Sequence, residues 1–92
     1  MIEYLYDTIR ATAGADVTIV SRIVEDDAIV ENVGLMIHLD NDNAIVIPGV
    51  LENEIYQFVI PADVTRELRG RYWYCFCQAD KPLCFKEAIY FV

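Results

Sequence analysis

Short runs of alternating apolar and polar residues recur along the chain, and clusters of Gly, Pro, Asn and Asp interrupt them about every eight to twelve residues. Alternation is the pattern of a half-buried β-strand, because successive side chains of a strand point to opposite faces of its sheet. Short strands separated by regular turns are typical of a sandwich or a barrel. The sequence therefore predicts an all-β fold.

We expect one domain that spans residues 1–92, because a chain of this length has no room for a second core. The longest break between strands, Pro61–Gly70, is predicted to hold one helical turn, Val64–Leu68, with Asp63 as its cap. The seven expected strands are Ile2–Arg10, Asp16–Val24, Val33–Leu39, Asn43–Ile47, Ile55–Ile60, Arg71–Gln78 and Leu83–Val92.

The period of two also assigns faces to these strands. His38 lies opposite the apolar side of the third expected strand, and we expect it to be half-exposed. The residues expected to share an apolar side are Val17, Ile19, Ser21 and Ile23 in the second strand, Val33, Leu35, Ile37 and Leu39 in the third, and Tyr56, Phe58 and Ile60 in the fifth.

The last two expected strands are apolar on both faces. A tight turn centred between Asp80 and Lys81 sets their register, and the opposed pairs are then Cys77–Cys84, Phe76–Phe85 and Cys75–Lys86. One face holds Tyr72, Tyr74, Phe76, Phe85, Ile89 and Phe91, and the other holds Trp73, Cys75, Cys77, Cys84, Lys86, Ala88 and Tyr90. A sheet face in water normally carries polar residues, so we expect a partner to cover the second face.

The chain carries 15 acidic and 7 basic residues and has a formal net charge of -8. This charge argues against binding to a nucleic-acid backbone or to an anionic membrane. Residues 1–60 hold 11 acidic and 2 basic residues, whereas residues 61–92 hold 4 acidic and 5 basic ones. Either one end or face of the molecule is therefore much more acidic than the other, or the acidic residues serve solubility alone. The chain carries three arginines around the turn before the sixth expected strand, Arg66, Arg69 and Arg71. They are either a docking site for the acidic end of a neighbouring copy or solvated loop charges.

The amino-terminal segment has acidic residues where a secretory signal has basic ones, and no segment has the roughly 20 apolar residues of a membrane span. The three cysteines, Cys75, Cys77 and Cys84, would leave one thiol over in a closed disulfide framework. We expect a reduced protein made in the cytoplasm. The first Met and the apolar end suggest a whole small reading frame, and Tyr90–Val92 are expected to pair with another subunit.

No group of residues has the pattern of a catalytic or cofactor site. His38 has no identifiable Ser or Cys partner, and the glycines are isolated. The run Asp40–Asn43 resembles the start of a calcium loop, but Ile45 and Leu51 stand where Gly and Glu are required, and an ordinary turn is the simpler interpretation. A zinc site of His38 and the three cysteines, and a Cys77–Cys84 disulfide, are alternatives to buried thiols. We expect a protein that is not an enzyme and binds no cofactor or metal.

The stretch Phe58–Thr65 and the following Leu68–Tyr74 resemble the penultimate-strand region of immunoglobulin-like domains in phage tail and baseplate proteins. That region consists of an extended strand, a turn rich in Pro, Ala and Thr, and a Leu-x-Gly-x-Tyr entry into the next strand. Gly70 and Tyr72 also resemble the tyrosine corner of immunoglobulin-type sandwiches. No cysteine precedes Cys75 to bridge the sheets, so the antibody subclass is excluded.

The resemblance implies an immunoglobulin-like antiparallel β-sandwich, similar to the amino-terminal domain of baseplate upper proteins, with Gly70 and Tyr72 as its structural corner. It implies a structural component of a bacteriophage virion, in the tail, the baseplate or the capsid decoration, that contacts other virion proteins or forms a homo-oligomer. The apolar second face supplies the expected protein interface, which is Trp73, Cys75, Cys77, Ala88 and Tyr90. The alternative is a carbohydrate- or receptor-binding module that stacks sugars on its aromatic residues.

Overall fold

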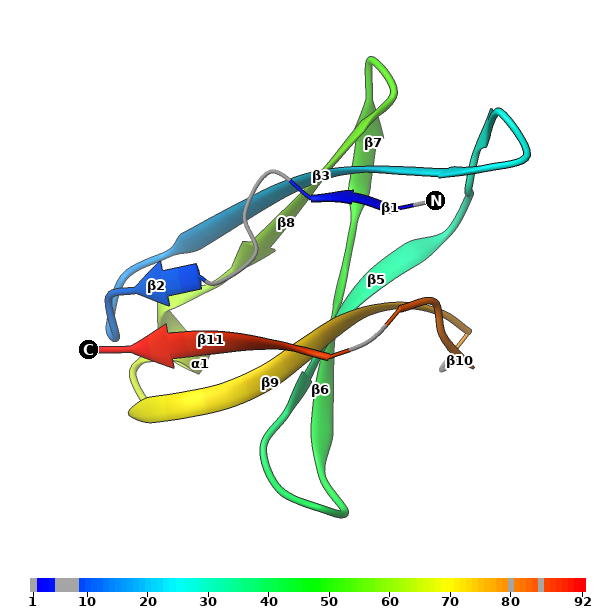
Figure 1. Ribbon diagram of the computed structural model, residues 1–92. Helices are drawn as coiled ribbons and strands as arrows, with labels where there is room; N and C mark the ends of the chain where they lie inside the picture. The colour runs from blue at the N-terminus through cyan, green and yellow to red at the C-terminus, as the bar shows by residue number, and fades with distance from the viewer. Residues whose placement is uncertain (1, 5–8, 80, 85) are drawn as a thin grey trace.

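The computed structural model describes residues 2–4, 9–79, 81–84 and 86–92, which form two packed β-sheets (Figure 1). One sheet has the order β1-β3-β8-β7 with β4 beside β3, and the other has the order β2-β11-β9-β5-β6 with β10 beside β9. The first sheet contains β1 (Ile2–Tyr4), β3 (Val17–Glu25), β4 (Ala28–Ile29), β7 (Val50–Glu52) and β8 (Ile55–Ile60). The second contains β2 (Ile9–Ala11), β5 (Val33–His38), β6 (Ala44–Pro48), β9 (Gly70–Gln78), β10 (Lys81–Pro82) and β11 (Glu87–Phe91). The predicted all-β sandwich is confirmed.

The expected first strand is two strands in different sheets. β1 pairs antiparallel with β3, whereas β2 pairs parallel with β11, so the two cannot belong to one straight strand. Residues 5–8 of the expected strand lie outside the described residues. The described residues form eleven strands rather than seven because of this division and because β7 and the two-residue strands β4 and β10 lie outside the expected strands.

Gly49 is the point at which the chain passes from one sheet to the other. β6 and β7 follow each other as one nearly straight segment on either side of it (Figure 1). Its N–H donates to the Val33 carbonyl at 3.0 Å. A Cβ on Gly49 would lie 2.6 Å from Phe58 Cε1, 2.7 Å from Tyr56 Cδ1 and 2.8 Å from the Val33 oxygen. Only glycine fits at this crossing without movement of the core.

The predicted faces of the strands agree with the buried core between the sheets. Phe58 of β8 and Phe76 of β9 contact each other across the sheets, with ring centroids 5.2 Å apart. Leu39, the last member of the predicted set, is exposed, and His38 is half-buried as expected. The core comprises Ile9, Ala11, Ile19, Ile23, Val33, Leu35, Ile37, Tyr56, Phe58, Ile60, Leu68, Tyr74, Phe76, Ile89 and Phe91.

The short helix α1 spans Ala62–Thr65, earlier than the predicted turn, and Pro61 rather than Asp63 is its cap. Asp63 instead pairs with Arg66 at 2.7 Å, one turn along the helix. Thr65 is fully buried, and its hydroxyl donates to the Ala15 carbonyl at 2.7 Å while it accepts the Gly14 N–H at 3.1 Å. The Asp16 carboxylate also accepts the Ala62 N–H at 2.7 Å, so two side chains hold the helix to the segment before β3.

The last hairpin has two registers. β11 pairs with β9 in the predicted register, with Ala88 opposite Trp73. β10 also pairs with β9, but in a different register that places Pro82 opposite Cys77. The predicted Cys77–Cys84 pair is therefore wrong, and Lys86 precedes β11 rather than pairing with Cys75. Two extra residues lie between the registers because Leu83 donates its N–H to the Phe76 carbonyl at 2.9 Å and the Phe76 N–H donates to the Cys84 Sγ at 3.4 Å. Asp80 and Phe85 lie outside the described residues.

The crossing at Gly49 predicts that Gly49→Ala is the most damaging small substitution of a glycine in the sandwich. The added methyl meets two core rings and a backbone oxygen, so we expect the free energy of unfolding to fall by about 3 kcal/mol in urea titrations. Gly34→Ala is the control. Its Cβ would meet a Val46 methyl at 2.8 Å, and that half-exposed side chain can turn away. Equal losses in the two variants would contradict the assignment of the crossing.

Thr65→Val removes the hydroxyl that ties α1 to the turn before β3 and keeps the volume of the side chain. The Gly14 N–H and the Ala15 carbonyl then lose a partner, so we expect a loss of about 1–3 kcal/mol in the free energy of unfolding. Thr18→Val, at an exposed position of β3, should change it by less than about 0.5 kcal/mol. The same titrations measure both variants, and an unchanged Thr65→Val midpoint would contradict the role of the hydroxyl.

Candidate protein-contact face

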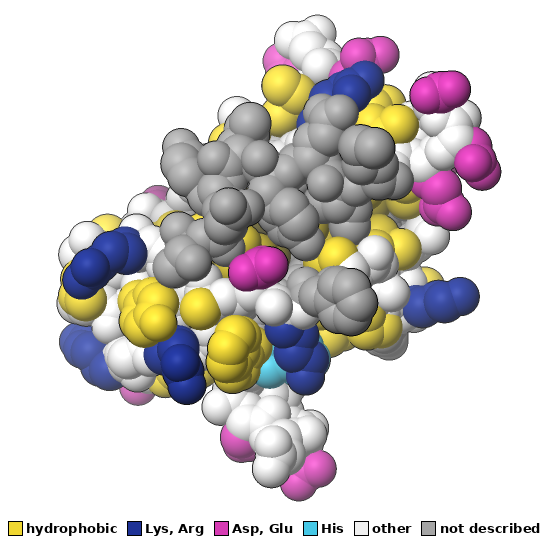
Figure 2. All heavy atoms as spheres, viewed as in Figure 1, with side chains coloured by type: hydrophobic (Ala, Val, Ile, Leu, Met, Phe, Trp, Pro, Cys, Tyr) yellow, Lys and Arg dark blue, Asp and Glu magenta, His cyan; other side chains and the backbone are white. Residues whose placement is uncertain are grey.

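The outer surface of β2, β9 and β11 carries a cationic–aromatic face, which we define as Arg10, Arg71, Trp73, Lys86, Ala88 and Tyr90. The register places Ala88 beside Trp73 and places Tyr90 between Arg71 and Arg10. Figure 2 views this face: Lys, Arg and hydrophobic side chains intermingle over β9 and β11 around one acidic side chain near the centre of the view, while most other Asp and Glu lie at the top, at the upper right and at the bottom. The face is thus separated from the main acidic loops.

Trp73 is the large aromatic residue at the centre of this face. Its side chain is 43% exposed, and the Arg71 guanidinium lies 5.0 Å from the centroid of its ring. This distance allows a cation–π interaction that holds the arginine over one side of the indole. A hollow of about 200 Å³ lies beside the ring, and His38, Asp40 and Lys86 contribute to its lining. The indole therefore has a fixed cation on one side and a polar hollow next to it.

Cys75 and Cys77 point to the same side of β9 as Trp73 but are buried, at 0% and 2% exposure. They pack with Met36 and with Cys84, which reaches them from the irregular segment before β11. Only part of the expected interface is therefore accessible. Surface remains exposed on Trp73, Ala88 and Tyr90, whereas the chain itself covers the two cysteines.

The thiols lie in a weakly polar environment. Burial raises the pKa of the Cys75 thiol from 9.0 to about 11, with smaller increases from Cys84 and Cys77, while Lys86 opposes the shift. Burial, followed by the charge of Lys86, lowers the pKa of His38, whose Nε2 lies 3.8 Å from the Cys75 Sγ. Both shifts favour uncharged forms, a neutral thiol beside a neutral imidazole.

The described residues contain no group of three or more His, Cys, Asp or Glu that could hold a metal ion, and the three cysteines are free thiols. The Asp40–Asn43 run forms a turn. One oxygen of the Asp40 carboxylate accepts the N–H groups of Asp42 and Asn43 at 2.8 Å each, and the other accepts the Asn43 Nδ2 at 2.9 Å. The Asn43 side chain and then these backbone bonds lower the pKa of Asp40. Its oxygens are thus used within the turn.

Gly70 and Tyr72 form a local bracket at the start of β9. The Tyr72 hydroxyl accepts the Arg69 N–H at 3.3 Å, and Gly70 between them has a φ of +86°. The Tyr72 ring packs edge-on against Phe91, with centroids 6.0 Å apart. A glycine is favoured at this φ, because a side chain would be strained there. The two residues therefore fix the entry of the chain into β9.

The three arginines of this region have different partners. Arg66 pairs with Asp63, and the Arg69 guanidinium donates to the carbonyls of Arg66 and Leu68 at 2.9 and 2.8 Å. Arg71 lies over Trp73 instead. Two of the three charges are therefore used within the turn, and Arg71 alone belongs to the cationic–aromatic face.

The carboxyl-terminal strand has no free edge for another subunit at residues 89–91. β11 pairs with β9 on one side and with β2 on the other, and the Val92 N–H donates to the Ala11 carbonyl at 3.0 Å. The expected pairing of Tyr90–Val92 with a second subunit is wrong, because the chain's own amino-terminal segment fills that position.

The sequence reasoning missed a second exposed surface, along β6, β7 and β8. The sequence signal for this surface was the nine-residue stretch 43–51, which contains no charged residue. A hollow of about 400 Å³ lies there and is lined by Ile47, Pro48, Val50, Gln57, Val59 and Pro61. The exposed large apolar residues of this surface are Val46, Val50, Leu51, Ile55 and Val59.

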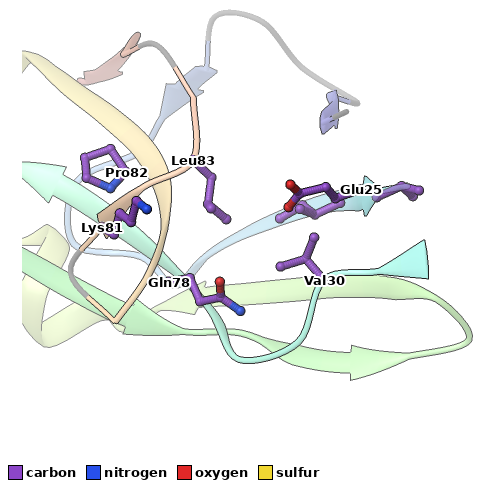
Figure 3. Close-up of a pocket in the computed structure, with 8 residues that line it drawn as sticks. Glu25, Val30, Gln78, Lys81, Pro82 and Leu83 are labelled. Atoms are coloured by element: carbon purple, nitrogen blue, oxygen red, sulfur yellow. The ribbon is translucent and has the colours of Figure 1, made fainter. Parts of the chain in front are cut away.

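Another hollow, of about 390 Å³, lies between the end of β3 and β10. Figure 3 shows Lys81, Pro82 and Leu83 on one side of it and Glu25 and Val30 on the other. Its lining offers a carboxylate and an ammonium group but no His, Cys or Ser.

No family model and no curated protein matches this chain. Among the described residues, no helix has the length and apolar character needed to cross a membrane.

The thiol environment predicts an order of reactivity. In the native chain at pH 8, iodoacetamide should modify half-buried Cys84 first, because Cys75 is buried and keeps its proton up to a pH of about 11. Peptide mapping by mass spectrometry measures the rate at each cysteine, and the urea-unfolded chain is the control in which the rates should converge. Native labelling of Cys75 at the rate of Cys84 would contradict the burial.

Proposed function

We propose that this chain is an immunoglobulin-like, non-enzymatic structural module of a bacteriophage particle that acts through protein–protein contacts. The sheet orders support the immunoglobulin-like part. In that fold one sheet has the strand order A-B-E-D, and the other holds C, F and G with C′ added in variable-type domains. The orders β1-β3-β8-β7 and β11-β9-β5-β6 correspond to A-B-E-D and G-F-C-C′.

The bracket at the start of β9 also supports this part of the proposal. A tyrosine corner joins a Tyr hydroxyl near the start of strand F to the backbone a few residues upstream, at the corner after strand E. Tyr72 accepts the Arg69 N–H in the segment between β8 and β9, which is the corresponding place. The phage particle itself is proposed on the resemblance of residues 58–74, which include this corner.

The observation that carries the contact function is the exposed Trp73 among cations, in a chain of net charge -8. Within the described residues, Arg10, Arg71 and Lys86 have no ion pair. Tryptophan, tyrosine and arginine are the residue types enriched at the energetic centres of protein interfaces. We therefore propose Trp73, Ala88 and Tyr90 as the contact residues for another virion protein or for a copy of this chain.

The carbohydrate-binding alternative uses the same tryptophan. A sugar ring would stack on the exposed indole beside the polar hollow, which Arg71 also lines. It predicts binding on a glycan array that Trp73→Ala abolishes. Such a result would replace the protein-contact proposal.

The protein-contact proposal predicts a discrete oligomer in light scattering of the purified chain in reducing buffer, across a range of concentrations. Trp73→Glu with Tyr90→Glu should give a monomer without lowering the melting temperature by more than a few degrees, because Trp73 is exposed and Tyr90 half-buried outside the core. Val92→Glu, at an apolar side chain that is 66% exposed, is the control and should leave the mass unchanged. An unchanged mass of the double variant would count against self-association through this face.

A further inference from the structure

Residues 44–52 form an edge that runs along both sheets and has no further strand beside it among the described residues. β6 is the last strand in the order of the second sheet and β7 the last in the order of the first, and Gly49 joins them. Figure 1 shows the two strands as one long segment between a turn at each end. Nine extended residues span about 30 Å. We call this segment the β6–β7 edge.

The hydrogen bonds of β6 show which backbone groups are free for a partner. The Leu39 N–H donates to the Asn43 carbonyl and the Gly49 N–H donates to the Val33 carbonyl, so residues 43 and 49 face β5. Antiparallel pairing alternates, and therefore Ile45 and Ile47 also bond to β5. The N–H and C=O groups of Ala44 and Val46, and the carbonyl of Pro48, point away from the sheet. The edge thus offers donors and acceptors in the pattern of a strand that lacks its neighbour.

The side chains along the β6–β7 edge are apolar. Val46 and Val59 are each 45% exposed and Val50 is 65% exposed, and the hollow of about 400 Å³ lies between β8 and the Ile47–Val50 segment. Free sheet edges in natural proteins usually carry charges or bulges that prevent pairing with other chains. This edge carries no charge over residues 43–51, which favours the addition of an apolar strand.

Acidic turns flank the edge at both ends. Asp40 and Asp42 precede β6, Glu52 ends β7, and Glu54 lies in the turn between β7 and β8. The Arg22 guanidinium lies 3.8 Å from Glu54 and offsets part of that charge. A second copy of this chain would bring acidic turns against acidic turns in either strand direction. The charge pattern therefore disfavours self-pairing and favours a segment with cations at both ends.

We infer that the β6–β7 edge accepts an extended strand of a partner protein, with apolar residues at alternating central positions and Lys or Arg at both ends. The partner's backbone pairs with the free groups of Ala44 and Val46, its apolar side chains enter the hollow, and its cations lie against the two acidic turns. This surface is separate from the cationic–aromatic face, and the inference does not depend on the proposed contacts of Trp73.

The test uses capped synthetic peptides and the full chain. The probe has the sequence Lys-Lys-Val-Thr-Val-Thr-Val-Lys-Lys, one matched peptide replaces every Lys by Glu, and another replaces the central Val by Pro. In titration calorimetry at low salt, the Lys peptide should bind at least about tenfold more tightly than either matched peptide, because the Glu ends meet like charge and the Pro lacks a donor. NMR spectra should show the largest amide shifts at Ala44 and Val46.

Variants separate the β6–β7 edge from other surfaces. Val46→Lys with Val50→Lys should weaken binding of the Lys peptide about tenfold or more, since it puts cations beside the apolar centre and repels the probe. Val92→Lys is the matched control, because Val92 is 66% exposed and Val50 65%. Trp73→Glu with Tyr90→Glu should bind the peptide normally, whatever its effect on oligomerisation.

Three results would overturn the inference. The first is equal binding of the three peptides, and the second is loss of peptide binding in the Trp73→Glu, Tyr90→Glu variant, which would move the site to the cationic–aromatic face. The third is an oligomer of the purified chain that Val46→Lys with Val50→Lys dissociates, because the occupant would then be a second copy.

Discussion

The backbone at Gly49 lies close against the rings of Tyr56 and Phe58, and this approach decides how the chain joins the two sheets. A segment that begins in one sheet and ends in the other must pass the core where the two sheets meet. At Gly49 the core atoms lie less than 3 Å from the position that a Cβ would take. The crossing places β6 beside β5 and β7 beside β8. β6 and β7 thus join the two sheets along one side of the sandwich. Among the described residues, no strand lies beside them on their outer side.

Much of the fold could be predicted from local periodicity. The buried faces of β3 and β8, and the pairing of Ala88 with Trp73, followed from alternation and from one turn. Periodicity does not say which sheet a strand joins, and for that reason the division into β1 and β2 and the crossing at Gly49 were missed. The shared face of Trp73, Ala88 and Tyr90 was predicted. A partner was expected to cover Cys75 and Cys77, whereas the chain itself covers them, because two extra residues carry Cys84 over them.

The two accessible surfaces have opposite chemistry. The cationic–aromatic face places Trp73 among cations, whereas the β6–β7 edge is uncharged at its centre and acidic at its ends. Under the two proposals, one face contacts a virion protein or another copy, and the edge takes an extended strand with basic ends. Under both proposals, this separation allows one small chain to bind two partners at once, and the acidic turns disfavour pairing between identical edges.

The most direct test of this account is hydrogen exchange of the backbone amides of β6 in the purified chain, followed residue by residue by NMR. A free β6–β7 edge predicts alternation: the amides of Ile45 and Ile47 are protected by β5, whereas those of Ala44 and Val46 exchange much faster because they face solvent. Equal protection at all four amides would mean that another strand already covers this edge, and it would contradict the free β6–β7 edge on which the inferred docking rests.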